Sequence, residues 1–373
     1  MRILTVVGAR PQFVKAAVVS TAIDAHGVSR DTQIDEVLIH TGQHYDANMS
    51  DVFFRDLHMR PVTENLGVGS GTHGQQTGAM VAALEQTLLS HRPDLILLYG
   101  DTNSTLAGAL AASKLHVPIA HVESGLRSFN RRMPEEVNRV ITDHISTLCL
   151  CPTQTAVDNL AGEGIVDGVA NVGDVMLDCT MQFALGDGNK AGVLDRLGLH
   201  AAGGMAEPYY LATVHRPENT DDSTRLASIV RGLSELGRPV VLPLHPRTRN
   251  KLESYGVELG GNIVSLEPVG YPEMVELEAN ARVILTDSGG VQKEAYFLGV
   301  PCVTMRDETE WVETVEVGWN IVVGASTERI IDATQALQVS TVGSVRPSIF
   351  GDGHAGAKVV DSLVSWYEES KRA

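Results

Sequence analysis

Residues 94–122 read DLILLYGDTNSTLAGALAASKLHVPIAHV and hold the pattern that runs through the whole chain. Two short apolar runs, residues 94–99 and 118–122, stand on either side of a segment with helical periodicity. The runs are apolar at almost every position, as strands are when both faces of a sheet are covered. Two such strands separated by a helix predict a parallel βαβ unit.

The same alternation extends outward from this unit in both directions. Residues 72–90 predict a helix that buries Met80, Val81, Leu84 and Leu88 on one face and ends before Pro93. Further strands in the first half are predicted at residues 2–7, 36–40, 147–151 and 169–172. In the second half they are predicted at residues 210–214, 239–244, 262–266, 282–286, 301–305 and 320–323. The sequence therefore predicts an α/β fold with two doubly wound parallel sheets.

A segment rich in Gly, Ala and Asp, residues 186–207, separates the two series and marks a domain boundary. We predict an N-terminal domain over residues 1–184 and a C-terminal domain over residues 185–355. Residues 356–373 predict a final helix that can pack back on the first domain. A chain of 373 residues suits this division, at about 100 to 200 residues per domain.

Charge and composition restrict the possible partners. The chain carries 29 Lys plus Arg against 46 Asp plus Glu, and its net charge of -17 would repel nucleic acid and anionic lipid surfaces. We therefore predict neither as a partner. Its four cysteines lack zinc-ligand spacing and are predicted to be reduced and buried. No apolar run reaches the length of a signal core or a membrane span, so we predict a cytoplasmic protein.

Two glycine-containing turns follow predicted strands and are candidates for binding phosphate. The first, GARP at residues 8–11, places Arg10 at the start of a helix. The second, TDSGG at residues 286–290, offers Ser288 as a helix cap and two glycines that admit phosphate to backbone N–H groups. Glu294 lies further along that helix, where it can accept hydrogen bonds from a ribose diol. Taken alone, each motif also fits an ordinary strand-to-helix turn, and neither has the spacing of a Walker loop or a dinucleotide fingerprint.

Three carboxylates and two histidines stand at comparable positions. Asp101 and Glu123 each end a predicted strand, which places both at one rim of the sheet, and Glu135 opens a helix. Clustered carboxylates raise one another's pKa, as proton abstraction and return near neutral pH require. Alternatively, Asp101 and Glu135 serve helix starts. His215 and His245 follow strands of the second half and suit proton transfer or phosphate binding, and no histidine has zinc-enzyme spacing.

These motifs resemble those of the non-hydrolysing UDP-N-acetylglucosamine 2-epimerase family over residues 1 to about 358. The matching segments are GARP at 8–11 with Lys15, GDT at 100–102, HVESGLR at 121–127, PEE at 134–136 with Asn138 and Arg139, LTDSGG at 285–290 and MRD at 305–307. The resemblance implies the GT-B architecture, in which two Rossmann-like domains face a central cleft, and a homodimer.

The resemblance also implies a reaction and a set of roles. Family members eliminate UDP to give a 2-acetamidoglucal and add it back with the proton on the other face of C2, without a metal or another cofactor. The positions matching catalytic residues are Asp101, Glu123, Glu135 and His215. The positions matching substrate or UDP ligands are Arg10, Lys15, His245, Ser288, Gly289, Gly290 and Glu294.

Other segments are similar to a branch that acts on UDP-2,3-diacetamido-2,3-dideoxyglucuronate. They are GARPQF at 8–13, HTGQHYD at 40–46, AASKLHVP at 111–118 and TEWVE at 309–313. Trp311 stands where the usual pattern has Arg, and Asp46 where allosterically activated members carry a different polar residue. Arg127, Arg131 and Arg132 are candidates to pair with the sugar carboxylate of that substrate. A GT-B glycosyltransferase, a UDP-sugar-binding regulator and a hydrolysing epimerase remain alternatives, since a fold does not fix a function.

Overall fold

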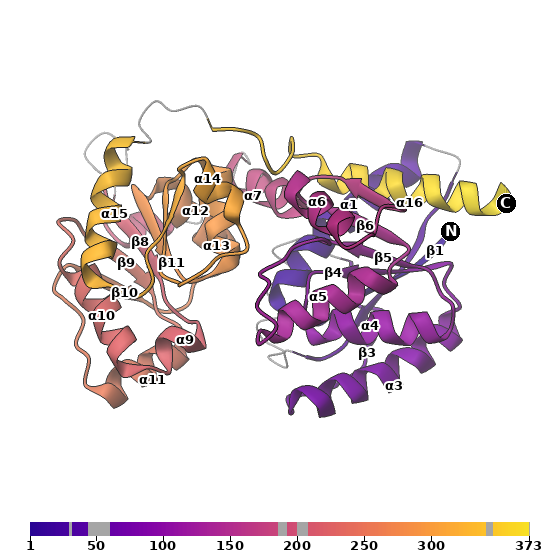
Figure 1. The fold of residues 1–373 in the computed structure, drawn as a ribbon, viewed down its shortest axis with the longest axis horizontal. Helices are drawn as coiled ribbons and strands as arrows, with labels where there is room; N and C mark the ends of the chain where they lie inside the picture. The colour runs from indigo at the N-terminus through magenta and orange to yellow at the C-terminus, as the bar shows by residue number, and fades with distance from the viewer. Residues whose placement is uncertain (30–31, 44–59, 186–191, 200–207, 341–345, 373) are drawn as a thin grey trace. The chain divides into compact units, whose positions relative to one another are not determined.

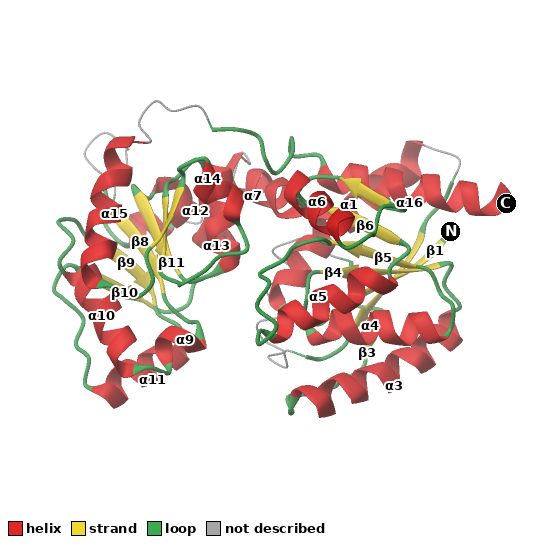
Figure 2. Cartoon of the chain, viewed as in Figure 1, coloured by secondary structure: helices red, strands yellow, loops and turns green. Residues whose placement is uncertain are grey.

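The structure is a computed structural model that describes residues 1–29, 32–43, 60–185, 192–199, 208–340 and 346–372. The chain forms two compact units, one of residues 1–179 with 348–373 and one of residues 180–347. Each unit has its own parallel sheet with helices on both faces (Figures 1 and 2). The predicted pair of doubly wound α/β domains is therefore confirmed.

The first unit is built on seven strands, counted over the described residues, in the order β3-β2-β1-β4-β5-β6-β7. Its strands are β1 (Arg2–Val7), β2 (Asp35–His40), β3 (Glu64–Asn65), β4 (Leu95–Tyr99), β5 (Ile119–Val122), β6 (Leu148–Cys151) and β7 (Val169–Asn171). Its helices are α1 (Arg10–Ser29), α3 (His73–His91), α4 (Asn103–Lys114), α5 (Pro134–Ile145), α6 (Gln154–Gly162) and α16 (Ala355–Arg372), and α7 (Val175–Leu185) leads into the second unit.

Successive residues of the central strands point to opposite faces of this sheet, and helices cover both faces. Leu4 and Val6 of β1 join Ile96 and Leu98 of β4 in a core beneath α3 and α4. Ile3 of β1 points to the opposite face, where α1 lies with α16 packed against it (Figure 1). The C-terminal helix thus belongs to the same compact unit as the N-terminal strand.

The second unit has six strands within the described residues, in the order β10-β9-β8-β11-β12-β13. Its strands are β8 (Tyr210–Thr213), β9 (Val240–Pro243), β10 (Ile263–Leu266), β11 (Val283–Thr286), β12 (Cys302–Thr304) and β13 (Asn320–Val322). Its helices are α8 (Val193–Arg196), α9 (Pro217–Thr220), α10 (Ser223–Ser234), α11 (Pro246–Tyr255), α12 (Tyr271–Asn280), α13 (Gly289–Leu298), α14 (Val312–Glu316) and α15 (Thr327–Ser340).

The strand order of each sheet reverses at one point. In the first unit β1 pairs with both β2 and β4, and in the second β8 pairs with both β9 and β11, all in parallel. Ligands of open parallel sheets bind outside the carboxyl ends of the strands at such reversals. The turns after β1 and β4, and after β8 and β11, are therefore the places to look for a site.

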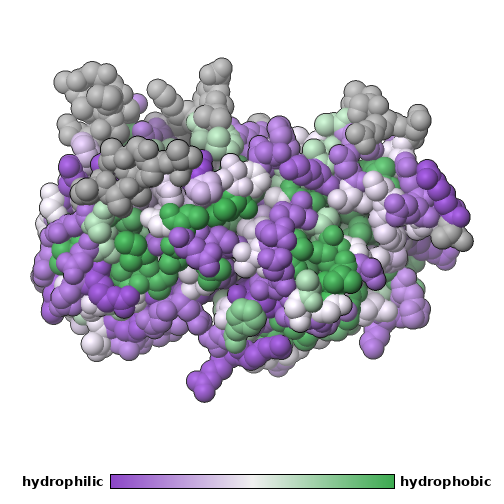
Figure 3. All heavy atoms as spheres, turned by 45° about the horizontal axis from the view of Figure 1, so that its top comes forward, coloured by the Kyte–Doolittle hydropathy of each residue, from purple (hydrophilic) through white to green (hydrophobic). Residues whose placement is uncertain are grey.

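Two further observations concern burial and the surface. All four cysteines, Cys149, Cys151, Cys179 and Cys302, are buried and free, as predicted. No helix in the described residues is long and apolar enough to cross a membrane. On the face drawn in Figure 3 hydrophilic residues are widespread and hydrophobic residues form separate areas.

Candidate active site

The carboxyl ends of β4 and β5 bring two of the predicted catalytic residues together in the first unit. The two strands are neighbours in the sheet, Asp101 follows β4 and Glu123 follows β5. Lys15 of α1 forms an ion pair with the Oε2 atom of Glu123, and its charge also acts on Asp101. Lys15 is only 7% exposed, so this interaction is poorly screened by solvent.

Asp101 is held as an anion. Arg139 of α5 forms an ion pair with it, and the Nε–Oδ2 distance is 3.1 Å. Burial raises the pKa of Asp101, but the positive charges of Arg139 and Lys15 outweigh that effect and leave the pKa below its ordinary value. The prediction that clustering raises the carboxylate pKa is therefore wrong for Asp101. An ionised Asp101 can accept a proton but has none to donate.

Glu123 has an unusual backbone conformation. Its φ is 69°, a left-handed value that costs a non-glycine residue about 1 to 3 kcal/mol. Its N–H group donates to the carbonyl oxygen of Leu150 at 3.0 Å. Across from it, a Cβ atom added to Gly100 would lie 3.2 Å from Oε2 of Glu123 and 3.3 Å from Nζ of Lys15. Glycine at position 100 thus leaves room for the ion pair.

The start of α5 supplies the third predicted carboxylate and one that the sequence reasoning missed. Glu135 is partly exposed, and its side chain makes no hydrogen bond with the described residues. Glu136 is buried and accepts hydrogen bonds from the backbone N–H groups of Ser128 and Phe129, each at 2.9 Å. Glu136 therefore fixes the loop that joins the Glu123 turn to α5.

A second buried network, also missed, fixes the turns themselves. His121 of β5 bonds Asp143 through Nδ1 and the carbonyl oxygen of Gly100 through Nε2, both at 2.7 Å. Asp143 also accepts from Arg127 at 2.7 Å. Arg127 pairs in addition with Glu163 and its side chain is 1% exposed, so it is occupied within the fold. The prediction that Arg127 is a candidate partner for a sugar carboxylate is wrong.

The turn after β1 differs from the predicted phosphate site. The Oε1 atom of Gln12 accepts hydrogen bonds from the N–H groups of Gly8 at 2.8 Å and Ala9 at 3.0 Å. These two donors are therefore already used by the protein. The side chain of Arg10 lies outside the described part of the structure.

In the second unit three of the predicted ligands, Ser288, Gly289 and Gly290, lie between the end of β11 and the first turn of α13. Ser288 follows β11 and stands at the N-cap of α13, but its side chain makes no capping hydrogen bond, which differs from the prediction. A Cβ atom added to Gly290 would meet only Ser288 Oγ within 4 Å, at 3.9 Å. The helix start is therefore open at Gly290. A Cβ atom added to Gly289 would lie 2.5 Å from a carboxyl oxygen of Glu310.

Asp287 anchors His215 beside this helix start. Asp287 is fully buried and accepts hydrogen bonds from the N–H groups of His215 at 3.1 Å and Arg216 at 3.0 Å, and from Asn219 at 3.1 Å. Its Oδ1 atom also lies 3.2 Å from Nδ1 of His215. Burial raises the pKa of Asp287, but the hydrogen bonds from these partners have the larger opposite effect, so the pKa lies below its ordinary value. The His215 side chain remains 43% exposed and can reach a ligand.

The remaining predicted ligands occupy different surroundings. His245 follows β9 and caps α11, where Nδ1 accepts from the N–H group of Arg247 at 3.2 Å. Glu294 lies on α13 and is 6% exposed. Trp311 is buried, and Nζ of Lys293 lies 4.2 Å from its ring centroid. Asp46 lies outside the described residues.

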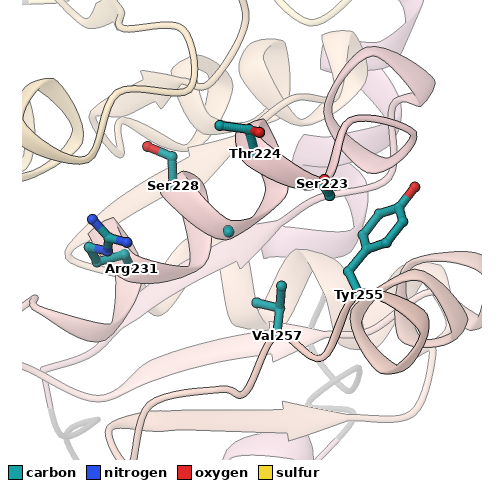
Figure 4. Close-up of a pocket in the computed structure, with 7 residues that line it drawn as sticks. Ser223, Thr224, Ser228, Arg231, Tyr255 and Val257 are labelled. Carbon is teal, nitrogen blue, oxygen red and sulfur yellow. The ribbon is translucent and has the colours of Figure 1, made fainter.

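A surface pocket of about 480 Å³ lies elsewhere in the second unit (Figure 4). It is lined by Ser223, Thr224, Ala227, Ser228 and Arg231 of α10, by Tyr255, the last residue of α11, and by Val257 just beyond that helix. None of these residues was predicted to bind a ligand.

Comparison with known proteins identifies the family. The family model described as UDP-N-acetylglucosamine 2-epimerase matches residues 26–364. The chain belongs to this family. Two curated members cover 97% of the chain, and the chain covers 99% of each. One, from Methanococcus maripaludis, is named UDP-N-acetylglucosamine 2-epimerase homolog and is 50% identical. The other, from Pseudomonas aeruginosa, is named UDP-2,3-diacetamido-2,3-dideoxy-D-glucuronate 2-epimerase and is 49% identical.

A solved structure of an epimerase agrees with this assignment. The Methanocaldococcus jannaschii UDP-GlcNAc 2-epimerase in complex with UDP-GlcNAc and UDP is 41% identical and has a TM-score of 0.87. The match covers 98% of this chain and 100% of the solved chain. The predicted family and the GT-B class of two Rossmann-like domains are confirmed. As a member of the UDP-sugar 2-epimerases, the chain is an isomerase.

Proposed function

We propose that this chain interconverts UDP-N-acetylglucosamine and UDP-N-acetylmannosamine without hydrolysis. The observation that carries the proposal is the cluster of Asp101, Glu123 and Lys15 at the ends of neighbouring strands. It supplies carboxylates for proton transfer and a buried cation beside them. A glycosyltransferase or a regulator has no need for this combination.

The proposed reaction begins with removal of the C2 proton of the sugar by a carboxylate. The C2–H electron pair forms the C1–C2 double bond while the C1–O bond breaks and UDP leaves as the diphosphate anion. Return of UDP to C1, with a proton delivered to the opposite face of C2, gives the epimer. Asp101 suits proton removal because it is held ionised, and Glu123 and Glu135 are the other proton carriers.

The second unit supplies the proposed UDP site. The open start of α13 at Ser288, Gly289 and Gly290 suits the diphosphate, since backbone N–H groups and the helix dipole favour an anion there. His215 stands on the neighbouring strand end and can donate a hydrogen bond to a phosphate oxygen.

Further ligands complete the proposed substrate site. We propose that His245 contributes to UDP binding from the end of β9 and that Glu294 accepts hydrogen bonds from the ribose. Arg10 and Lys15 are the proposed cationic ligands from the first unit.

The test is conversion of purified substrate. Incubation with UDP-GlcNAc should yield UDP-ManNAc, resolved by chromatography, with no free amino sugar. The Asp101→Asn variant should lose this conversion and the exposed Asp332→Asn variant should retain it. Release of free N-acetylmannosamine and UDP would instead establish a hydrolysing epimerase and overturn the proposal.

One observation favours a second candidate, UDP-2,3-diacetamido-2,3-dideoxyglucuronate. The Pseudomonas relative named for that substrate is 49% identical, which is as similar as the 50% identical Methanococcus maripaludis relative named UDP-N-acetylglucosamine 2-epimerase homolog. The side chains of Arg131 and Arg132 are exposed and form no ion pair with the described residues, so they can pair with the additional carboxylate.

We also propose that the enzyme acts as a cytoplasmic homodimer that supplies a nucleotide sugar for polysaccharide biosynthesis. The family resemblance supports the dimer, and the free, buried cysteines suit a reducing compartment. Light scattering of the purified protein tests the dimer directly, since a mass near 40 kDa would contradict it.

A further inference from the structure

Left-handed backbone occurs at a few residues other than glycine in the described part of the chain. These residues are Arg92, His116, Glu123 and Phe129. Arg92 is the C-cap of α3 and His116 follows the C-cap of α4, where a left-handed residue commonly ends a helix. Glu123 and Phe129 end no helix, and both lie in the segment that leads from β5 to α5. The proposed catalytic Glu123 therefore shares its segment with a second strained residue.

Phe129 combines strain with exposure. Its φ is 58°, a conformation that is unfavourable for a bulky residue. Its side chain is 75% exposed, the highest value among the large apolar residues of the described part. Asn130, which follows directly, is a residue type that adopts left-handed backbone more readily than Phe does. A single exposed apolar residue is ordinary, but a phenyl ring in water on strained backbone is costly twice over.

Hydrogen bonds on both sides of Phe129 hold this conformation. The carboxylate of Glu136 is buried and accepts from the N–H group of Phe129 at 2.9 Å and from Oγ of Ser128 at 3.0 Å. Oγ of Ser128 in turn accepts from the N–H group of Asn130 at 3.3 Å. The N–H group of Met133 donates to the carbonyl oxygen of Asn130 at 2.9 Å. The loop therefore presents the ring from a fixed backbone.

The group that fixes Phe129 is also connected to the proposed base. Oε2 of Glu136 lies 3.2 Å from a terminal nitrogen of Arg139, and Nε of Arg139 lies 3.1 Å from Oδ2 of Asp101. One carboxylate and one guanidinium thus separate the backbone of Phe129 from Asp101. The other two proposed proton carriers stand before and after this loop in the sequence. Strained residues cluster at active sites, where their position is used.

We propose that Phe129 is a substrate-binding residue whose ring packs against the apolar part of the sugar, its C–H groups and an acetamido methyl group. A phenyl ring has no N–H or O–H group to donate, so an apolar partner suits it. Both candidate substrates carry an acetamido group. The ring also excludes water from the carboxylates and retains the unsaturated sugar until UDP adds back. This role rests on the proposed function.

Three substitutions of one residue separate the ring from the backbone. Phe129→Ala removes the ring and keeps the strain, Phe129→Gly removes both, and Phe129→Tyr keeps the ring. Val166→Ala is the matched control, since Val166 is a 66% exposed apolar residue of the same unit.

The first measurement is urea unfolding of the variants without a ligand. Phe129→Gly should have a folding equilibrium constant roughly fivefold above that of Phe129→Ala, because glycine adopts a positive φ without steric cost. Equal stability of the two variants would show that position 129 is not strained and would overturn the proposal.

The second measurement is steady-state conversion of UDP-GlcNAc. Phe129→Ala and Phe129→Gly should both lower kcat/KM by roughly tenfold or more, the scale of losing a buried phenyl contact. Phe129→Tyr and Val166→Ala should stay within a few fold of wild type. Calorimetry should show UDP affinity within a few fold of wild type for all variants. A Gly variant that is more stable and as active as wild type would overturn the proposal.

The third measurement follows the products. If the ring retains the unsaturated sugar, both ring-deleted variants should release more free UDP and unsaturated sugar per epimer formed than wild type does. An unchanged ratio would contradict this part of the proposal and leave Phe129 without a role in retention.

A second copy of the chain is the competing partner for an exposed ring. Light scattering at the concentrations of the kinetic assays should give Phe129→Ala the same mass as wild type. A lower mass would assign the ring to a subunit contact and overturn the proposal.

These outcomes are distinct from failure of the proposed function. If wild type converts UDP-GlcNAc and the Phe129 variants do so equally well, the role of the ring is wrong and the proposed function stands. If wild type does not convert UDP-GlcNAc, the proposed function fails, and the sugar contact fails with it.

Discussion

Lys15 and Glu123 form a buried ion pair although 108 positions separate them in the sequence. The pair joins α1 to the end of β5 and places a positive charge beside Asp101 at the end of β4. In a proposed reaction that removes a weakly acidic proton and expels a diphosphate, this cation has two uses. It keeps the base ionised, and it attracts the anionic substrate.

Loss of the Glu123 carboxylate should reduce catalysis and not UDP binding. We expect Glu123→Gln to lower turnover by about 10² or more, the scale for a general acid or base, with UDP affinity within a few fold of wild type. Steady-state kinetics and calorimetry measure the two effects. Glu369→Gln, an exposed position on α16, is the control. Near-normal turnover of Glu123→Gln would remove Glu123 from the mechanism.

Removal of the Lys15 charge should change the pH profile. The charge lowers the pKa of Asp101, so Lys15→Met should raise that pKa and protonate the base at higher pH. We expect the acidic limb of the kcat/KM profile to move up by roughly 1 pH unit or more. Lys114→Met, at an exposed position at the end of α4, should leave the limb in place. An unshifted limb in Lys15→Met would show that Asp101 is not the titrating base.

Asp287 should contribute both stability and the orientation of His215. Asp287→Asn removes a buried acceptor of three N–H groups and should destabilise the protein by about 2 kcal/mol at pH 7, with weaker UDP binding. The pKa of Asp287 is lowered, so its stabilisation is present above the unfolded pKa, near 3.9, and is lost as pH falls through the folded pKa.

Urea unfolding at pH 7 and at pH 3.5 tests this prediction. The difference between wild type and Asp287→Asn should shrink at the lower pH, and the exposed Asp332→Asn control should show little difference at either. A gap that is equal at both values would be inconsistent with an ionised Asp287.

A side chain at position 290 should leave folding unaffected but should interfere with UDP binding at the start of α13. A Cβ atom there has only Ser288 Oγ within 4 Å, so Gly290→Val should fold normally and weaken UDP binding by roughly tenfold or more. Gly261→Val, where an added Cβ also has open space, is the control. Calorimetry with UDP decides, and unchanged affinity in Gly290→Val would place the diphosphate elsewhere.

Sugar preference should depend on Arg131 and Arg132 if the second candidate substrate is correct. In that case kcat/KM for UDP-2,3-diacetamido-glucuronate should exceed that for UDP-GlcNAc by more than tenfold. Arg131→Ala or Arg132→Ala should erase the difference, while Arg231→Ala, in the pocket of Figure 4, should not. Equal or greater efficiency on UDP-GlcNAc would reject this candidate.

The sequence predicted the strands and their ends well, because each strand is a local run of apolar residues. Parallel topology then places the carboxyl ends of neighbouring strands at the same edge of the sheet. Asp101 and Glu123 could be placed at one rim on that basis alone. Glu136 and Asp143 could not be recognised, because they occupy ordinary helical positions and their partners depend on side-chain packing. The same limit explains why Arg127 looked available and why Gln12 was not expected to occupy the turn at Gly8.

Exchange of the C2 proton with solvent tests the central claim most directly. Purified protein is incubated with UDP-GlcNAc in deuterated water, and C2 is followed by NMR. We predict that deuterium appears at C2 while UDP is still attached to the sugar, and that Glu123→Gln slows this exchange by about 10² or more. Conversion or binding of UDP-GlcNAc without deuterium at C2 would contradict the account.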